Sequence, residues 1–224
     1  MISALFLDLD DTIFPTRSIP DHISRPFFQA IRASNKHLTD ADLNNAEQAM
    51  WNSPIHLVFQ QYHFTEEMIS GALSALEAAN LTGLIKPYPD YNFVRNLPCE
   101  KFLITSGFTQ FQKKKIRALN ISSHFREIMI DDPLLDGKGK RDAFDRLIEK
   151  YQIQKKEILV IGDNPSSEIE AGNELGLTTI LIDRRNTPPG EGLAYYTFPT
   201  LSAMIDAFPD LRTPNTEASS QSAG

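Results

Sequence analysis

The chain has 224 residues, 41% of them hydrophobic and 23% charged, with a formal net charge of −7 at pH 7. This length supports one sizeable hydrophobic core, or a core with a small accessory domain. The acidic balance argues against a general nucleic-acid binder, which would carry a basic surface. The longest apolar runs are too short to cross a bilayer, and the N-terminus lacks the pattern of a signal peptide.

Cys99 is the only cysteine, so no internal disulfide is possible, which fits a protein of the reducing cytoplasm. We interpret Cys99 as a structural residue rather than a catalytic thiol. The strongest basic clusters, at 112–117 and 136–141, are short and lie on or beside expected helices. We expect most of their lysines to lie on solvated helix faces.

Five short runs rich in Ile, Leu, Val and Phe are nearly continuous in apolar residues, which is typical of strands buried on both faces. These runs span residues 4–9, 101–106, 127–130, 157–163 and 178–183. Helical patterns separate the last four runs, at 109–120, 141–151 and 164–176. This alternation predicts an α/β fold in which helices cover both faces of a parallel sheet.

Roughly 90 residues separate the first two strands, far more than a simple crossover needs. Residues 21–84 have helical patterns and no strand, so we expect an all-helical domain inserted after the first strand, with Trp51 and Phe59 in its interior. Proline-rich segments at 15–21 and 86–91 are suited to act as hinges. The expected division is a core domain of residues 1–15 and 90–211, a helical insert of 16–89 and a disordered tail of 212–224.

Two aspartates, Asp8 and Asp10, follow the first strand directly. At positions i and i+2 of an extended backbone, their side chains share a side, and Thr12 follows two residues further on. Asp11 would point the other way, and we interpret it as a turn residue. Like charges this close repel each other, so a partner that offsets their charge is expected.

Polar residues also follow the other strands. The second strand ends in Thr105 and Ser106, the third is followed by Lys138, and the fourth ends in Asp163 with Glu168 in the next turn. Ligands of such sheets bind beyond the carboxyl ends of the strands, so we expect these residues to converge. Clustered carboxylates suit Mg²⁺, whereas hydroxyls, backbone N–H groups and a lysine suit a phosphoryl group.

Four motifs carry a family resemblance. They are "DLDDT" after the first strand, "LITSG" at the end of the second, "KGKRDAF" after the third and "VIGDNPSSEIEAG" at the fourth. In this order and spacing they resemble the motifs of the haloacid dehalogenase (HAD) superfamily, most of whose members are phosphatases. The likeness covers the chain except its tail and is greatest to nucleotidase-like branches. It implies a Rossmann-like three-layer sandwich in which the helical insert is a cap over the site.

The resemblance implies roles at the acidic positions. Asp8 would be the nucleophile and a ligand of Mg²⁺. Asp10 would be the general acid/base and, through its backbone carbonyl, a second ligand, and Asp163 would be the third. Thr12 and Glu168 would support the site from outside the metal ligands. Because Glu168 is one methylene longer than the Asp found in many members, we expect it to reach the metal through water at most.

The resemblance also implies a phosphoryl-binding set. Thr105, Ser106 and Lys138 would hold the transferring phosphoryl group. The third motif lacks the prolines usual in the family, which leaves Lys140 as a rival to Lys138. We favour Lys138, because its spacing to Phe144 and to the fourth motif fits the family pattern.

The function implied is Mg²⁺-dependent hydrolysis of a small phosphomonoester through an aspartyl phosphate. A nucleoside monophosphate, a sugar phosphate and phosphoglycolate all fit, and neither a nucleic acid nor a membrane is expected as a partner. A phosphomutase uses the same motifs and is the alternative. A 2-haloacid dehalogenase is less favoured because it needs neither an acid at the second motif position nor a metal. A non-catalytic binding module is disfavoured because no expected acid is missing.

Overall fold

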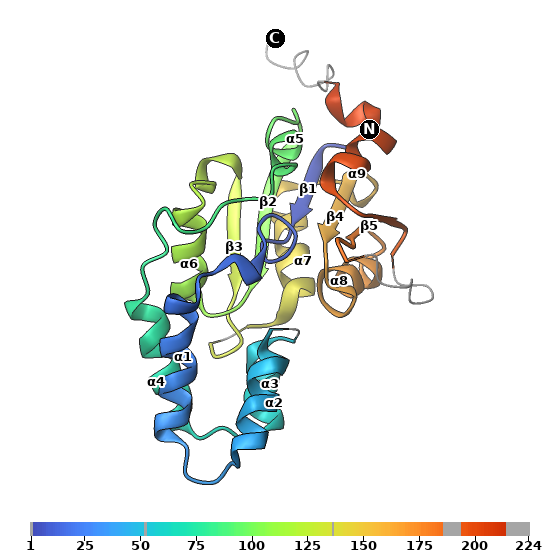
Figure 1. Cartoon of the computed structure of the whole chain (residues 1–224). Helices are drawn as coiled ribbons and strands as arrows, with labels where there is room; N and C mark the ends of the chain where they lie inside the picture. Colours follow the sequence, from blue (N-terminus) through green and yellow to red (C-terminus); the bar gives the residue numbers. More distant parts are fainter. Residues whose placement is uncertain (1, 52, 136, 186–193, 214–224) are drawn as a thin grey trace.

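A six-stranded parallel sheet lies at the centre of the molecule (Figure 1). The computed structural model describes residues 2–51, 53–135, 137–185 and 194–213. The strand order is β3-β2-β1-β4-β5-β6. The strands are β1 (Ala4–Leu7), β2 (Glu100–Ser106), β3 (Glu127–Asp131), β4 (Ile158–Gly162), β5 (Thr178–Ile182) and β6 (Tyr196–Phe198).

The five predicted strands are confirmed, and β6 is an addition. Burial on both faces is confirmed for β1 and β4, whereas β3 lies at the edge of the sheet and is only partly buried. β6 has three residues and pairs with β5 at the edge of the sheet. A run this short shows no periodicity that a sequence pattern could reveal. The prediction of a parallel α/β sheet is confirmed, because every strand pair is parallel. The first strand is central, with β2 on one side and β4 on the other.

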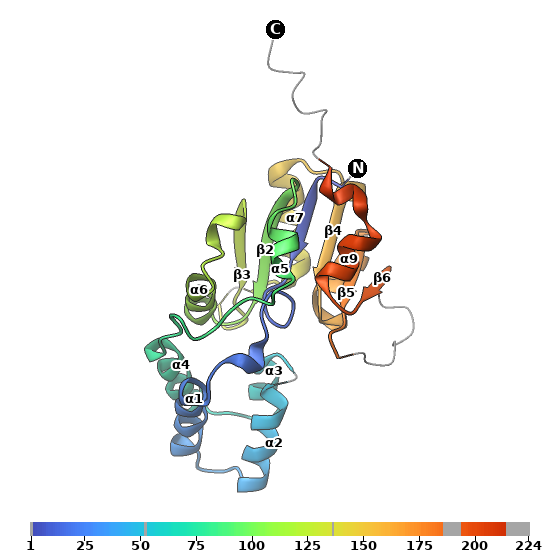
Figure 2. The same ribbon diagram turned by 45° about the horizontal axis from the view of Figure 1, so that its top comes forward.

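Helices cover both faces of the sheet, because alternate strand residues point to opposite sides. In β1, Leu5 and Leu7 join one hydrophobic cluster, and Ala4 and Phe6 join another. The first cluster also holds side chains of α5 (Tyr91–Arg95), α6 (Thr109–Ala118) and α9 (Leu201–Ala207). The second holds side chains of α7 (Gly139–Tyr151) and α8 (Glu170–Glu174). Figure 2 shows these helices on either side of the strands.

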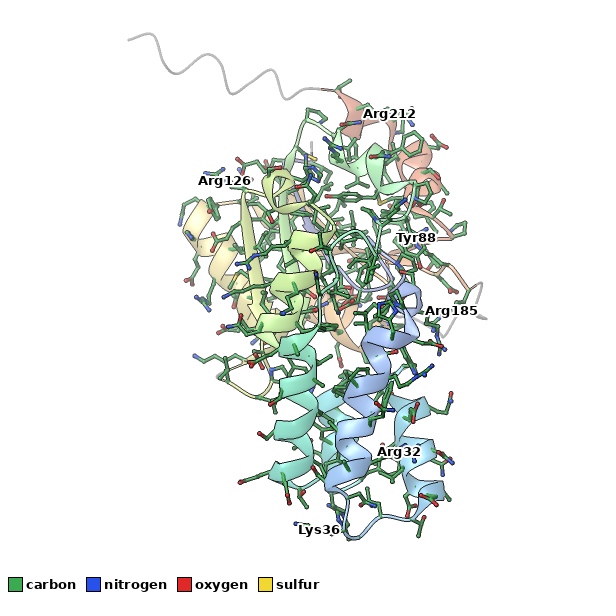
Figure 3. All side chains as sticks on the ribbon, turned by 60° about the vertical axis from the view of Figure 1, so that its left-hand side comes forward. Arg32, Lys36, Tyr88, Arg126, Arg185 and Arg212 are labelled. Carbon is green, nitrogen blue, oxygen red and sulfur yellow. The ribbon has the colours of Figure 1, made fainter. Side chains whose placement is uncertain are left out.

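The described residues between 21 and 84 form four helices and no strand, as predicted. They are α1 (Asp21–Ser34), α2 (Asp40–Met50), α3 (Ile55–Gln61) and α4 (Glu66–Ala78). These helices enclose a hydrophobic cluster of their own, which includes the buried Phe59. A reciprocal capping box between Thr39 and Asp42 fixes the start of α2. On the surface, Arg32 of α1 pairs with Glu47 of α2 at 3.0 Å (Figure 3).

The insert packs against the sheet domain at α6. Phe108, which precedes α6, packs in the cluster of the insert, and Phe111 contacts the clusters of both the insert and the sheet. Lys114 Nζ donates to the carbonyls of Glu77 and Ala79 at the C-terminal end of α4, at 2.6 and 2.9 Å. The side of α6 away from the sheet therefore forms part of the interface with the insert.

The second expected hinge, 86–91, is anchored at its C-terminal half. The Arg184 guanidinium lies 3.7 Å from the centre of the Tyr88 ring and donates to Asp90 and to the carbonyl of Thr12. Figure 3 shows Tyr88 at the side of the sheet domain, above the insert. These contacts tie the returning chain to the loop after β1.

Two further predictions concern the C-terminal tail and membrane-spanning segments. Most of the predicted tail, residues 214–224, lies outside the described residues, whereas Arg212 ends a short 3₁₀ helix, Pro209–Arg212, and pairs with Asp206. Among the described residues, no helix combines the length and the apolar character needed to span a membrane.

Candidate active site

The loop after β1 brings two aspartates to the carboxyl end of the sheet. The Asp8 N–H donates to the carbonyl of Ile161, so Asp8 still pairs with β4 beyond the end of β1. The chain then turns at Asp11, whose φ of +52° and N–H bond to the Phe14 carbonyl confirm that Asp11 is a turn residue. Asp8 and Asp10 both line one cleft between the insert and the sheet domain.

Asp8 belongs to a buried ion-pair network with Lys140 and Glu168. Lys140 Nζ is 2.5 Å from Asp8 Oδ1 and 2.6 Å from Glu168 Oε2, and all three side chains are almost completely buried. The second oxygen of Glu168 accepts the backbone N–H of Asn164 at 2.7 Å. Glu168 is therefore closer to the centre of the site than expected, since its carboxylate lies with Asp8.

The structure places Lys140, and not the preferred Lys138, beside Asp8. Lys138 is exposed and is the residue before α7, whereas Lys140 is buried in the first turn and contacts Asp8. The two lysines differ in position because α7 begins between them, at Gly139, whose φ is +83°. That turn separates the two lysines, so the second of them faces the carboxyl end of the sheet.

Three carboxylates converge in this region. One oxygen from each of Asp8, Asp163 and Glu168 lies within 4.8 Å of the others. Hard oxygen ligands at this spacing are the donor set that Mg²⁺ takes in proteins, so the residues present fit such an ion. The side chain of Asp10 is not part of this cluster.

Negative charge exceeds positive charge in the cluster. Burial, reinforced by the charges of Asp8 and Glu168, raises the pKa of Asp163 to about 9. Burial also raises the pKa of Asp8 to about 7, although Lys140 opposes this shift. Burial alone would lower the pKa of Lys140, but its two carboxylate partners raise it overall. One lysine does not balance three acids, and a divalent cation would.

The two hydroxyls of the second motif, those of Thr105 and Ser106, have different hydrogen-bond partners. Thr105 is fully buried, and its Oγ1 accepts Nε2 of Gln112 at 2.7 Å. Ser106 lines the cleft, and its hydroxyl donates to Asp131 at 3.3 Å. Thr12 is buried beneath the loop, does not line the cleft, and its hydroxyl has no hydrogen-bond partner among the described residues.

Two residues of α6 at the site were missed by the sequence analysis. Lys115 Nζ lies 2.7 and 2.8 Å from the two carboxylate oxygens of Asp10, and Gln112 Nε2 donates to Oδ2 at 3.0 Å. Most lysines of this segment were expected to be solvated, but Lys115 is 5% exposed. Its position three residues after Gln112 and one turn after Phe111 places it on the inner face of the helix, and this spacing was the available signal.

The cleft has a volume of about 820 Å³. On the insert side it is lined by apolar and aromatic residues, including Phe28, Trp51 and Ile55, and by His56. Trp51 was expected inside the insert. Instead it is half-buried at the cleft, with its ring 6.0 Å from Phe28 and under the guanidinium of Arg17. The cleft therefore has an acidic floor and a partly aromatic wall.

Known proteins share both the sequence pattern and the fold. Over 202 residues the chain is 25% identical to the glyceraldehyde 3-phosphate phosphatase of Methanopyrus kandleri, which covers 82% of this chain and 85% of that protein. The structure of a HAD phosphatase from Thermococcus onnurineus matches with a TM-score of 0.67 and 17% identity, covering 95% of this chain and 100% of that one.

A second solved structure is a dehalogenase. L-2-haloacid dehalogenase from Xanthobacter autotrophicus matches with a TM-score of 0.61 and 14% identity, covering 93% of this chain and 99% of that one. The expected HAD-type α/β fold is thus confirmed, and the fold by itself does not select between the two reactions. The family model of haloacid dehalogenase-like hydrolases matches residues 2–176. The chain belongs to the haloacid dehalogenase-like hydrolase family.

Proposed function

We propose that this enzyme is a Mg²⁺-dependent phosphomonoester hydrolase that acts on a small metabolite through an aspartyl-phosphate intermediate. The proposal rests on the pair Asp8 and Asp10, which open onto one cleft but have different partners. An alkoxide leaving group needs a proton, and a second carboxyl group beside the nucleophile can supply it. A halide leaves without a proton, so Asp10 favours phosphoryl transfer over dehalogenation.

In this proposal, Asp8 and Asp163 would hold the Mg²⁺ together with the backbone carbonyl of Asp10. The Glu168 carboxylate lies within the same cluster and adds to its negative charge. When bound, Mg²⁺ would neutralise charge on the phosphoryl group and on the acids. Lys140 takes the place first given to Lys138, because its ammonium lies beside Asp8.

The proposed reaction has two steps. A carboxylate oxygen of Asp8 forms a bond to phosphorus while the bond from phosphorus to the leaving oxygen breaks, and Asp10 gives that oxygen a proton. Asp10 then takes a proton from water, and this water attacks the aspartyl phosphate, which releases phosphate and restores the carboxylate. Lys140 and the hydroxyls of Thr105 and Ser106 would hold the phosphoryl oxygens.

The substrate class is a small organic phosphomonoester. The cleft of about 820 Å³ has room for a group of the size of a sugar phosphate or a nucleoside monophosphate. A relative named for glyceraldehyde 3-phosphate supports a phosphorylated sugar or a similar metabolite. The single cysteine supports a cytoplasmic location.

The test is phosphate release from a panel of phosphomonoesters that includes triose phosphates, phosphoglycolate and nucleoside monophosphates. Each substrate is incubated with Mg²⁺ or with EDTA, beside an Asp10→Ala variant purified in the same way. We expect release that needs Mg²⁺, needs no bisphosphate activator and is lost in the variant. Release that survives EDTA, or no release from any ester although Mg²⁺ binds, would overturn the proposal. A requirement for a bisphosphate would identify a phosphomutase instead.

A further inference from the structure

We propose that Lys115 and Gln112 are positioning residues that hold the carboxylate of Asp10 at the mouth of the cleft, outside the Asp8, Asp163 and Glu168 cluster. This inference rests on the proposed function, in which Asp10 is the acid/base. Both oxygens of Asp10 accept from Lys115, at 2.7 and 2.8 Å, and Oδ2 also accepts from Gln112 at 3.0 Å. The Thr16 hydroxyl also donates to Oδ1, at a longer 3.3 Å. The shorter contacts all come from α6, which therefore contributes most to the position of this carboxylate.

The surroundings of Gln112 select one orientation of its amide. Nε2 faces three acceptors, which are Asp10 Oδ2, Thr105 Oγ1 at 2.7 Å and the carbonyl of Ser106 at 2.9 Å. A flipped amide would turn its own oxygen towards a carboxylate and a carbonyl, neither of which can donate. The amide nitrogen thus connects the expected acid/base to the expected phosphoryl-binding hydroxyl.

Gln112 occupies this place although one of its two polar side-chain atoms is buried without a hydrogen bond in the described part of the chain. Gln112 is 1% exposed, and its Oε1 has no hydrogen-bond partner among the described residues. A buried acceptor without a hydrogen bond destabilises the folded protein. We therefore infer that the contacts of Nε2 at the other end of the amide have a function. Gly107 contributes the space, because a Cβ there would lie 3.2 Å from Nε2 and its φ of +138° excludes most side chains.

Lys115 shows the same pattern. Its ammonium is buried between the rings of Phe14 and Phe111, whose centres are 5.6 and 5.1 Å away. Ring faces attract a cation but do not replace its hydration, so a buried lysine needs a carboxylate. Among the described residues Asp10 is the carboxylate with which Lys115 forms an ion pair.

The position of Asp10 follows from these contacts. Its side chain is 29% exposed on the cleft, whereas that of Asp8 is 7% exposed. Without Lys115, the Asp10 carboxylate would lose both of its shortest contacts. Held on α6, Asp10 stays where a leaving-group oxygen would arrive.

The experiment uses Lys115→Met, with Lys113→Met as the matched control, since Lys113 is an exposed lysine on the same helix. Cleavage is measured with enzyme in excess over two substrates: an alkyl monoester, whose leaving oxygen needs a proton, and p-nitrophenyl phosphate, whose leaving group needs little help. We expect Lys115→Met to slow cleavage of the alkyl ester by about 10²-fold, within the range of general acid catalysis, and of the aryl ester far less. Lys113→Met should match the wild type.

A purely structural role for Lys115 would slow both substrates equally, and that result would overturn the inference. So would wild-type rates for Lys115→Met in an enzyme that Asp10→Ala inactivates. A wild type that releases no phosphate would instead overturn the proposed function, and this inference with it. Lys115→Arg should recover part of the alkyl-ester rate, since it restores a cation next to Asp10.

Gln112→Leu tests the second positioning residue. Because Gln112 contacts Thr105 as well as Asp10, this variant should raise KM and lower kcat, whereas Lys115→Met should lower kcat with little change in KM. Unchanged KM and kcat in Gln112→Leu, with a circular-dichroism spectrum like that of the wild type, would remove Gln112 from the proposal.

Discussion

Asp8 and Asp10 are two residues apart, yet a different buried lysine reaches each of them from opposite faces of the sheet. Lys140 belongs to α7, which packs on the face that holds Phe6. Lys115 belongs to α6, which packs on the opposite face, the face that holds Leu5. The two halves of the site therefore have similar ion pairs and different surroundings.

The difference lies in burial and in the number of acids. Lys140 lies between two carboxylates that are almost fully buried, and Asp163 completes the cluster. Burial raises the pKa values of Asp8 and Asp163. Lys115 faces one carboxylate, that of Asp10, which remains partly exposed to the cleft. In the proposed function, Asp8 would thus serve the metal and nucleophilic attack, and Asp10 would contact the substrate. Different surroundings would then give two roles to the same residue type.

The largest effect is expected at the buried half. Asp8→Asn should lower turnover by about 10⁶-fold, the loss seen when a catalytic nucleophile is removed from other enzymes. The fold should remain, because an amide of the same shape fits the position. Phosphate release and a thermal unfolding curve check both parts. Near-normal turnover in this variant would mean that Asp8 is not the nucleophile.

The next effect separates the two candidate lysines. Lys140→Met should lower kcat by about 10²- to 10³-fold, as expected when a charged group that stabilises the transition state is lost. It should also cost roughly 3–5 kcal/mol of stability in the metal-free protein, because two buried carboxylates lose their cation.

Lys138→Met is the control, since Lys138 is exposed before α7. Its kcat and its urea midpoint should equal those of the wild type. A loss of activity in Lys138→Met, with Lys140→Met active, would restore the original preference and contradict the geometry described above.

A third effect concerns protons. Mg²⁺ needs carboxylates, but burial raises the pKa of Asp163 to about 9 and that of Asp8 to about 7, so part of these acids is protonated at pH 7. Binding should therefore release protons, and affinity should rise with pH, by about tenfold per unit for each proton displaced, until the acids are ionised. Calorimetry in buffers of different ionisation enthalpy measures the proton count.

Lys115→Met should leave this proton count unchanged, because Lys115 pairs with Asp10 outside the three-carboxylate cluster. Asp163→Asn should reduce it. A count that does not vary with the buffer, or an affinity that falls as pH rises, would show that these carboxyls do not bind the ion.

The smallest effect tests how closely the buried half is packed. A Cβ at Gly162 would overlap the carboxylate of Glu168, so Gly162→Ala should destabilise the protein by about 1–3 kcal/mol. Gly71→Ala in α4 is the comparison, because its Cβ would meet Ala30 at an ordinary 3.6 Å. That change should stabilise by about 0.5–1 kcal/mol. The urea midpoints of both variants measure these changes in stability. An unchanged midpoint in Gly162→Ala would mean that the Glu168 side chain can move to make space for a methyl group.

Much of the fold could be predicted because its signals are local. An apolar run followed by an acid predicts a buried strand with a polar end, and parallel strand ends must share one edge of the sheet. That reasoning placed Asp8, Asp10 and Asp163 correctly at this edge. β6 was missed because three residues carry no pattern, and Trp51 was misplaced because periodicity does not tell an interior from a cleft wall.

The patterns in the chain were sufficient for the parallel sheet, the helical insert and the acidic strand ends, because strand periodicity and polar punctuation act over a few residues. They were not sufficient to choose between Lys138 and Lys140, or to move Lys115 from solvent to the site. A lysine side chain is long, and its destination depends on how its helix begins and rotates against the sheet. Packing between distant elements decides that rotation, so only the tertiary structure shows which lysine meets which aspartate.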